Sequence, residues 1–121
     1  MKDYKTILTI ENDNSNRQLL NHILKKEYEV LSTTKPSEAK TKLETNSIDL
    51  IIMDVAFPKE NGFMFTKALK NNQQYQDIPI IIVTGYVSTE NRTACLEAGC
   101  DEYIPRPFER TQLLKTIKKY I

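Results

Sequence analysis

The sequence predicts an α/β domain in which a five-stranded parallel sheet is doubly wound, with five helices covering its two faces. Three short segments, at residues 7–10, 50–53 and 80–83, are almost wholly apolar, which is typical of strands that are covered on both faces. Weaker strand candidates lie at residues 28–33 and 102–105, with a helical pattern after each of the five. Because parallel neighbours need crossover connections, this alternation predicts a three-layer architecture.

The first and the last helix are predicted from apolar residues that recur at helical spacing, which places them on one face. The stripes consist of Leu19, Leu20, Ile23 and Leu24 in the first helix and of Leu113, Leu114, Ile117 and Ile121 in the last.

The three middle helices are predicted mainly from their boundaries. Pro36 stands in the first turn of the second helix, the third begins just after Gly62, and the fourth lies between Ser88 and Gly99. The residues expected to point inward are Phe65, Ala68 and Leu69 in the third helix and Val87, Ala94, Cys95 and Ala98 in the fourth. The fourth set is small, so this helix is expected to be held lightly and to shift easily.

Length and charge restrict the function classes. A chain of 121 residues is close to the commonest domain size, so residues 1–121 are expected to form one domain. The 17 basic and 16 acidic side chains nearly cancel, and net charge therefore does not predict direct binding of nucleic acid. The sequence has no apolar run long enough to span a membrane and no secretory signal, which predicts a cytoplasmic protein without membrane contact.

The two cysteines and the single histidine do not form a zinc-ligand pattern. Cys95 and Cys100 are five positions apart and His22 is distant in sequence. We expect the cysteines to be buried free thiols, with redox sensing as the alternative, and His22 to be a surface residue.

Polar residues follow the predicted strands at their carboxyl ends, where open parallel sheets bind their ligands. They are Glu11, Asn12 and Asp13 after the first strand, Asp54 after the third, Thr84 after the fourth and Arg106 after the fifth. Acids, a hydroxyl group and a cation are therefore expected to meet at one edge.

These residues carry a resemblance to a known family. Asp54 followed by Pro58 and Gly62 resembles the phosphorylation loop of CheY-like response-regulator receivers, which have the flavodoxin-like fold. Thr84 resembles the switch threonine, Tyr103 the switch aromatic residue, and the segment 106–108 the Lys-Pro-Phe segment with its cis peptide bond. The resemblance covers the whole chain.

The resemblance implies a phosphoprotein of two-component signal transduction. Asp54 is expected to accept a phosphoryl group from a sensor histidine kinase or a phosphotransfer protein, with Arg106 as the positioned cation. Thr84 would donate a hydrogen bond to the phosphoryl oxygens, and Tyr103 would move inward. The family's Mg²⁺ ligands correspond to Glu11, Asn12, Asp54 and the backbone carbonyl of Ala56.

Two departures from the family pattern affect this site. Asn12 supplies a neutral oxygen where the family has a second acid, so Mg²⁺ binding is expected to be weak. Arg106 replaces a lysine and, in the resting state, is expected to pair with Asp54. Asp13, one residue later, is an alternative source of the lost carboxylate.

The chain is not expected to be an enzyme, apart from slow loss of its own phosphate. Ala56 and Tyr86 correspond to positions beside the acyl phosphate, and neither would orient an attacking water well. A haloacid-dehalogenase-type phosphatase needs an acid where Ala56 stands. A flavodoxin-type electron carrier needs a glycine-rich phosphate loop after the first strand, and the segment 11–15 contains no glycine.

Two roles therefore stay open: a phosphorylation-dependent switch and a degenerate receiver that serves as a phosphorylation-independent interaction module. In the first role, the resemblance implies a downstream protein target that binds the face made by the fourth helix, fifth strand and fifth helix. Candidate contacts there are Arg92, Glu97, Tyr103 and Lys115.

Overall fold

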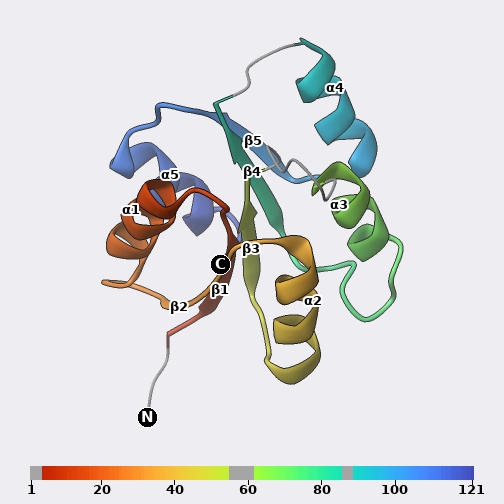
Figure 1. Ribbon diagram of the computed structural model, residues 1–121, viewed down its shortest axis with the longest axis horizontal. Helices are drawn as coiled ribbons and strands as arrows, with labels where there is room; N and C mark the ends of the chain where they lie inside the picture. Colours follow the sequence, from red (N-terminus) through yellow and green to blue (C-terminus); the bar gives the residue numbers. More distant parts are fainter. Residues whose placement is uncertain (1–3, 55–61, 86–88) are drawn as a thin grey trace.

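The fold is a five-stranded parallel sheet with helices on both faces, as the apolar runs predict. The computed structural model describes residues 4–54, 62–85 and 89–121, and Figure 1 shows the arrangement. The strands pair in the order β2-β1-β3-β4-β5, and every pair is parallel. Their bounds are β1 Thr6–Ile10, β2 Glu29–Thr33, β3 Leu50–Met53, β4 Ile80–Thr84 and β5 Glu102–Pro105.

The helices form two layers around this sheet. Figure 1 shows α1 and α5 on one face and α2, α3 and α4 on the other. Their bounds are α1 Asn14–Leu24, α2 Pro36–Thr45, α3 Gly62–Lys70, α4 Thr89–Ala98 and α5 Arg110–Lys118. Two apolar clusters match these layers, one joining the sheet to α1 and α5 and the other joining it to α2, α3 and α4.

The strength of each strand's sequence signal follows its place in the sheet. The central strands β1, β3 and β4 are almost entirely buried, whereas the edge strands β2 and β5 are partly exposed. An edge strand needs fewer apolar residues, and this explains why residues 28–33 and 102–105 gave weaker patterns.

Two predicted inward residues are in fact exposed. Leu19 is 53% exposed because the buried stripe of α1 runs through Leu20, Ile23 and Leu24, and Leu19 is rotated away from it. Ala68 is exposed because the inner face of α3 follows Gly62, Thr66 and Leu69 at i, i+4 and i+7. Phe65 is half-buried, so its inward placement is only partly confirmed.

The fourth helix has the small buried surface that its sequence predicts. Within the described residues of α4, only Cys95 and Ala98 are buried and Ala94 is half-buried. Val87 lies outside the described residues. The prediction of free thiols is wrong, because Cys95 and Cys100 are joined by a disulfide bond.

Polar contacts of Asp101 fix the amino-terminal end of β4, which lies at the edge of the sheet away from Asp54 and Thr84. Asp101 Oδ2 accepts hydrogen bonds from the Ile80 backbone N–H at 2.7 Å and from Lys70 Nζ at 2.9 Å. Lys70 also donates to the Ile78 carbonyl at 2.9 Å. One carboxylate thus joins the end of α3 to the starts of β4 and β5.

Candidate phosphoacceptor site

The two buried acids of the site leave adjacent strands at the same level. Ile10 and Met53 are paired in the register of β1 and β3, and Glu11 and Asp54 follow them directly. Glu11 is 1% exposed and Asp54 is 8% exposed. The backbone holds both positions, since the Asp54 N–H donates to the Ile10 carbonyl at 3.0 Å and the Glu11 N–H to the Thr33 carbonyl at 3.0 Å.

Arg106 joins the two acids. Its Nη1 donates to Asp54 Oδ2 at 2.8 Å, and its Nη2 donates to Glu11 Oε1 at 2.5 Å. The predicted pairing of Arg106 with Asp54 is therefore confirmed, and Glu11 is a second partner that the sequence did not indicate. The Arg106 backbone N–H donates to the Thr84 carbonyl at 2.8 Å, and this bond fixes the backbone of Arg106 beside the end of β4.

Burial and the contact with Arg106 shift the pKa of Glu11 in opposite directions. Burial raises the pKa of Glu11 above its ordinary value, and the charge of Asp54 adds to this rise. The hydrogen bond and the positive charge of Arg106 lower the pKa, but they do not offset the burial fully. One guanidinium thus serves two carboxylates.

The remaining predicted residues lie at the same edge with different degrees of access. Asn12 is exposed and lines a cavity of about 260 Å³ together with Glu11, Asp54 and Arg106. Thr84 is fully buried at the end of β4, and its neighbour Gly85 lines the cavity. Ala56, Pro58 and Tyr86 lie outside the described residues.

Asp13 has a structural task. Its carboxylate accepts the Asn16 backbone N–H at 2.8 Å and caps the amino terminus of α1. Its own N–H donates to Glu11 Oε2 at 3.1 Å. The cap explains Asp13 without a metal, although the residue also borders the cavity.

Two further side chains shape the site without having been predicted. Arg17 donates to the Glu11 carbonyl at 3.1 Å and to Asn14 Oδ1 at 2.6 Å, and so fixes the turn between β1 and α1. Phe108 lies under Arg106, with the guanidinium carbon 6.0 Å from the ring centroid. The sequence signal for Arg17 is weak, because a cation one turn into a helix is usually solvated.

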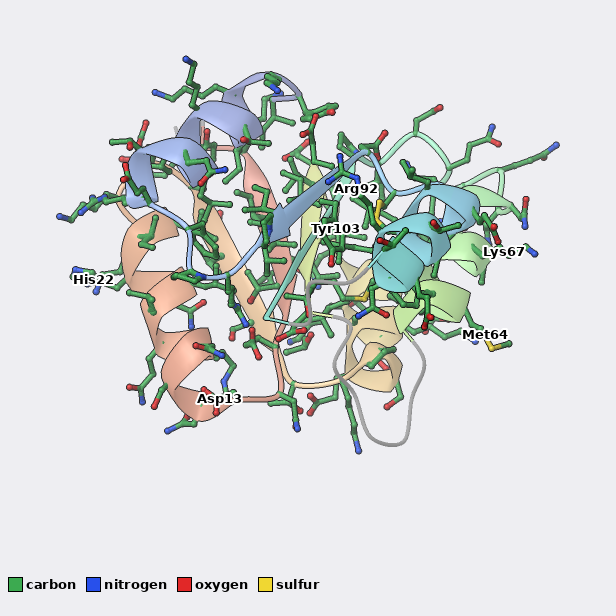
Figure 2. The ribbon with its side chains drawn as sticks, turned by 90° about the horizontal axis from the view of Figure 1, so that it is seen from above. Asp13, His22, Met64, Lys67, Arg92 and Tyr103 are labelled. Atoms are coloured by element: carbon green, nitrogen blue, oxygen red, sulfur yellow. A yellow bond between two sulfur atoms is a disulfide. The ribbon has the colours of Figure 1, made fainter. Side chains whose placement is uncertain are left out.

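An apolar groove of about 520 Å³ adjoins this pocket. It runs between α1 and the segment after β5, and Arg106 lines both spaces. Its apolar lining consists of Leu19, Leu20, Ile23, Pro107 and Phe108. His22 borders the groove, and Figure 2 shows it pointing outward from α1, which confirms a surface histidine.

The donors present suit a hard divalent cation. Mg²⁺ is commonly held by one or two carboxylates together with water, and Glu11 and Asp54 supply two carboxylates beside the Asn12 amide. Among the described residues no group of three or more His, Cys, Asp or Glu is placed to hold a metal. A cation entering here competes with Arg106 for both acids.

The comparison with known families agrees with this geometry. A family described as "Response regulator receiver domain" matches residues 7–118. The chain belongs to the response regulator receiver domain family. Among the described residues no helix is long and apolar enough to cross a membrane.

Individual relatives of this receiver domain match it along nearly its whole length. The polar-differentiation response regulator DivK of Brucella ovis is 29% identical over 118 residues, which are 97% of this chain and 96% of the relative. The chemotaxis protein CheY4 of Vibrio cholerae superimposes with a TM-score of 0.90 at 31% identity, covering 98% of this chain and 99% of that one.

One structural neighbour bears on the metal. The receiver domain of sensor histidine kinase PA1611 from Pseudomonas aeruginosa has a magnesium ion coordinated in its active site cleft. It superimposes on this receiver domain with a TM-score of 0.88 at 25% identity, covering 97% of each chain.

The predicted cis peptide bond between Arg106 and Pro107 is also confirmed.

Proposed function

We propose that this receiver domain accepts a phosphoryl group on Asp54 from a sensor histidine kinase or a phosphotransfer protein and then presents an altered face to a protein target. The observation that carries the proposal is that Asp54, Glu11 and Arg106 share one cavity at the carboxyl edge of the sheet. A cytoplasmic location is part of the same proposal.

In the proposed reaction a carboxylate oxygen of Asp54 attacks phosphorus. The bond between phosphorus and the donor's imidazole nitrogen breaks, the nitrogen keeps the electron pair, and an acyl phosphate forms. Attack by one anion on another needs positive charge nearby, which Arg106 supplies on its 2.8 Å contact with Asp54. Magnesium held by Glu11, Asn12, Asp54 and the Ala56 carbonyl would neutralise further charge.

The proposed switch passes from the pocket to α4 and β5. The Thr84 hydroxyl would donate a hydrogen bond to the new phosphoryl oxygens, and Tyr103, half-buried in β5 on the side of α4, would move inward (Figure 2). The lightly buried α4 would shift with it. A target would bind the face of α4, β5 and α5, on which Arg92, Glu97 and Lys115 are exposed.

Treatment with acetyl phosphate and magnesium chloride, followed by intact-mass and peptide spectrometry, tests this function. The expected result is one added phosphoryl group on the peptide that contains Asp54, and none in the Asp54→Asn variant. Asp77→Asn, on an exposed surface, is the matched control and should label normally. Labelling of wild type and Asp54→Asn to the same extent would refute the assignment of Asp54.

The label should also be lost slowly. We propose that the chain has no enzymatic turnover beyond hydrolysis of its own acyl phosphate, because Ala56 and Tyr86 are unsuited to orient a water molecule. A phosphate lifetime as short as that of the fastest receivers would contradict this part of the proposal.

A second function has a specific observation in its favour. Arg106 already bridges both carboxylates and Asn12 lacks a charge, so the resting pocket resists a divalent cation. A degenerate receiver that binds its partner without phosphorylation would show no label on Asp54. Its Asp54→Asn variant would bind the partner as well as the wild type does.

A further inference from the structure

The disulfide between Cys95 and Cys100 lies where α4 meets β5, outside the phosphoacceptor pocket. Cys95 is in the last turn of α4, and Cys100 lies two positions before Glu102, the first residue of β5. Their Cα atoms are 5.7 Å apart.

The backbone brings these two residues together whether or not they are bonded. The Cys100 N–H donates to the Cys95 carbonyl at 3.2 Å and the Gly99 N–H to the Leu96 carbonyl at 3.1 Å. With Gly99 at a φ of +94°, these bonds make a Schellman motif in which Cys95 and Cys100 are the two residues whose side chains touch. The covalent bond replaces an ordinary apolar contact, so the motif can persist after reduction.

The two cysteines differ in exposure. Cys95 is fully buried in the apolar cluster between the sheet and α2, α3 and α4, whereas Cys100 is half-buried at its margin. An incoming thiolate therefore reaches Cys100 first. The released Cys95 becomes a neutral thiol in an apolar environment, where cysteine is well tolerated.

We propose that Cys95 and Cys100 form a reversible thiol–disulfide site that controls the mobility of α4. One thiolate of a dithiol reductant attacks Cys100 Sγ, the S–S bond breaks, and Cys95 Sγ leaves with the electron pair and takes up a proton. The second thiol of the reductant then attacks the mixed disulfide and releases Cys100 as a thiol. Two electrons and two protons pass to the protein, and the reductant leaves as a disulfide.

Two physical arguments favour a reversible disulfide over one that only stabilises the fold. The bond closes a loop with only four residues between the cysteines, and short loops restrict the unfolded chain least. In a reducing compartment, moreover, the disulfides that do occur are mostly transient or redox-sensing.

The consequence for signalling rests on the proposed function. Apart from Cys95, the only buried residue in the described part of α4 is Ala98, so few side chains hold this helix, and the disulfide fixes its last turn to the segment that leads into β5. Oxidation would hold α4 against β5 and oppose the shift that phosphorylation requires. Reduction would free it.

A redox titration with glutathione buffers, followed by alkylation with N-ethylmaleimide and intact-mass spectrometry, tests the site itself. The expected result is conversion between a doubly alkylated and an unalkylated form under native conditions, in both directions. A bond that resists excess dithiothreitol until the protein is unfolded would overturn the proposal.

Hydrogen exchange of the oxidised and reduced wild type tests the control of α4. We expect amides in α4, with those of Gly99 and Cys100, to exchange roughly tenfold faster after reduction, because the covalent cross-link then no longer restrains local opening of the helix end. Amides of α2, on the same face, should be unchanged. Equal exchange of α4 in both states would also overturn the proposal.

Two variants complete the design. Cys100→Ser should behave like the reduced protein with or without dithiothreitol, and Cys95→Ala does the same while leaving no polar group in the core. Neither measurement uses a phosphodonor, so failure of this site is distinguishable from failure of Asp54 to accept phosphate. If the site titrates but Asp54 is never labelled, the redox site stands and only its link to phosphorylation falls.

Discussion

Arg106 and Asp54 form an ion pair of 2.8 Å although 52 residues separate them in the sequence. Arg106 follows β5, Asp54 follows β3, and β4 lies between these strands. The arginine side chain thus crosses the end of β4 and brings its charge to acids that belong to the centre of the sheet. This contact governs what the pocket can bind.

Replacing Arg106 by alanine should destabilise the metal-free protein by about 3 kcal/mol, because a buried ion pair that loses one partner leaves an uncompensated charge. Added magnesium should restore part of this loss, since the cation can then bind both carboxylates without competition. Urea denaturation with and without magnesium chloride measures both effects. Arg92→Ala, on the exposed surface of α4, should stay within about 0.5 kcal/mol of wild type in both conditions. An Arg106→Ala protein indifferent to magnesium would contradict a cation site at Glu11 and Asp54.

Replacing Asn12 by aspartate should strengthen magnesium binding by roughly tenfold or more, because a full negative charge then replaces a neutral oxygen beside a hard divalent cation. Isothermal titration calorimetry with magnesium chloride gives the affinity, and acetyl phosphate labelling should accelerate in parallel. Ser15→Asp adds the same charge on the exposed surface of α1 and should change the affinity little. If both aspartates act alike, the effect is only long-range attraction and Asn12 is not a ligand position.

Replacing Tyr120 by phenylalanine should reduce stability at neutral pH by about 1 kcal/mol, the usual net contribution of one hydrogen bond. Tyr120 Oη donates to Glu102 Oε2 at 2.6 Å, and this bond, with burial and nearby negative charge, raises the pKa of Tyr120 from 10.0 to about 12. The folded protein therefore holds this proton more tightly than the unfolded chain does. Its stabilising contribution is complete below pH 10 and is lost as the pH rises towards 12.

Denaturation curves between neutral pH and pH 12 check this prediction. The wild type should lose its advantage over Tyr120→Phe across the alkaline range, whereas Tyr4→Phe, an exposed tyrosine, should follow the wild type throughout. A constant difference between wild type and Tyr120→Phe at every pH would show that the hydroxyl is not held by Glu102.

Replacing Asp101 by asparagine should cost about 2 kcal/mol, because charge-assisted hydrogen bonds contribute more than neutral ones and Asp101 accepts two. Thermal and urea denaturation give the change in the free energy of unfolding. Asp77→Asn removes the same charge from an exposed position and should be nearly neutral. Equal losses in the two variants would mean that net charge, and not the contact with Lys70 and Ile80, is responsible.

Much of the fold could be predicted because each central strand is a continuous apolar run. The residues at 7–10, 50–53 and 80–83 are buried on both sides, and no helical alternative fits runs of four. The errors about which residues are buried arose on helices, where neighbouring residues differ by about 100° in direction. Leu19 and Ala68 are each one position away from the buried stripe, and apolar character alone does not distinguish them.

The candidate site was predicted less completely than the fold. Strand ends placed Glu11 and Asp54 together, but the second contact of Arg106 depends on the path of a long side chain, which no sequence pattern specifies. The disulfide did have a signal. Gly99 between Ala98 and Cys100 is typical of a helix end in a Schellman motif, and that motif places Cys95 beside Cys100.

The pairing of Ile10 with Met53 has a wider consequence. Because Glu11 and Asp54 each follow that pair, the separation of their backbones is set by the spacing of adjacent strands, about 4.8 Å, and not by the side chains around them. Mutations can therefore accumulate across the rest of the domain without pulling the two acids apart.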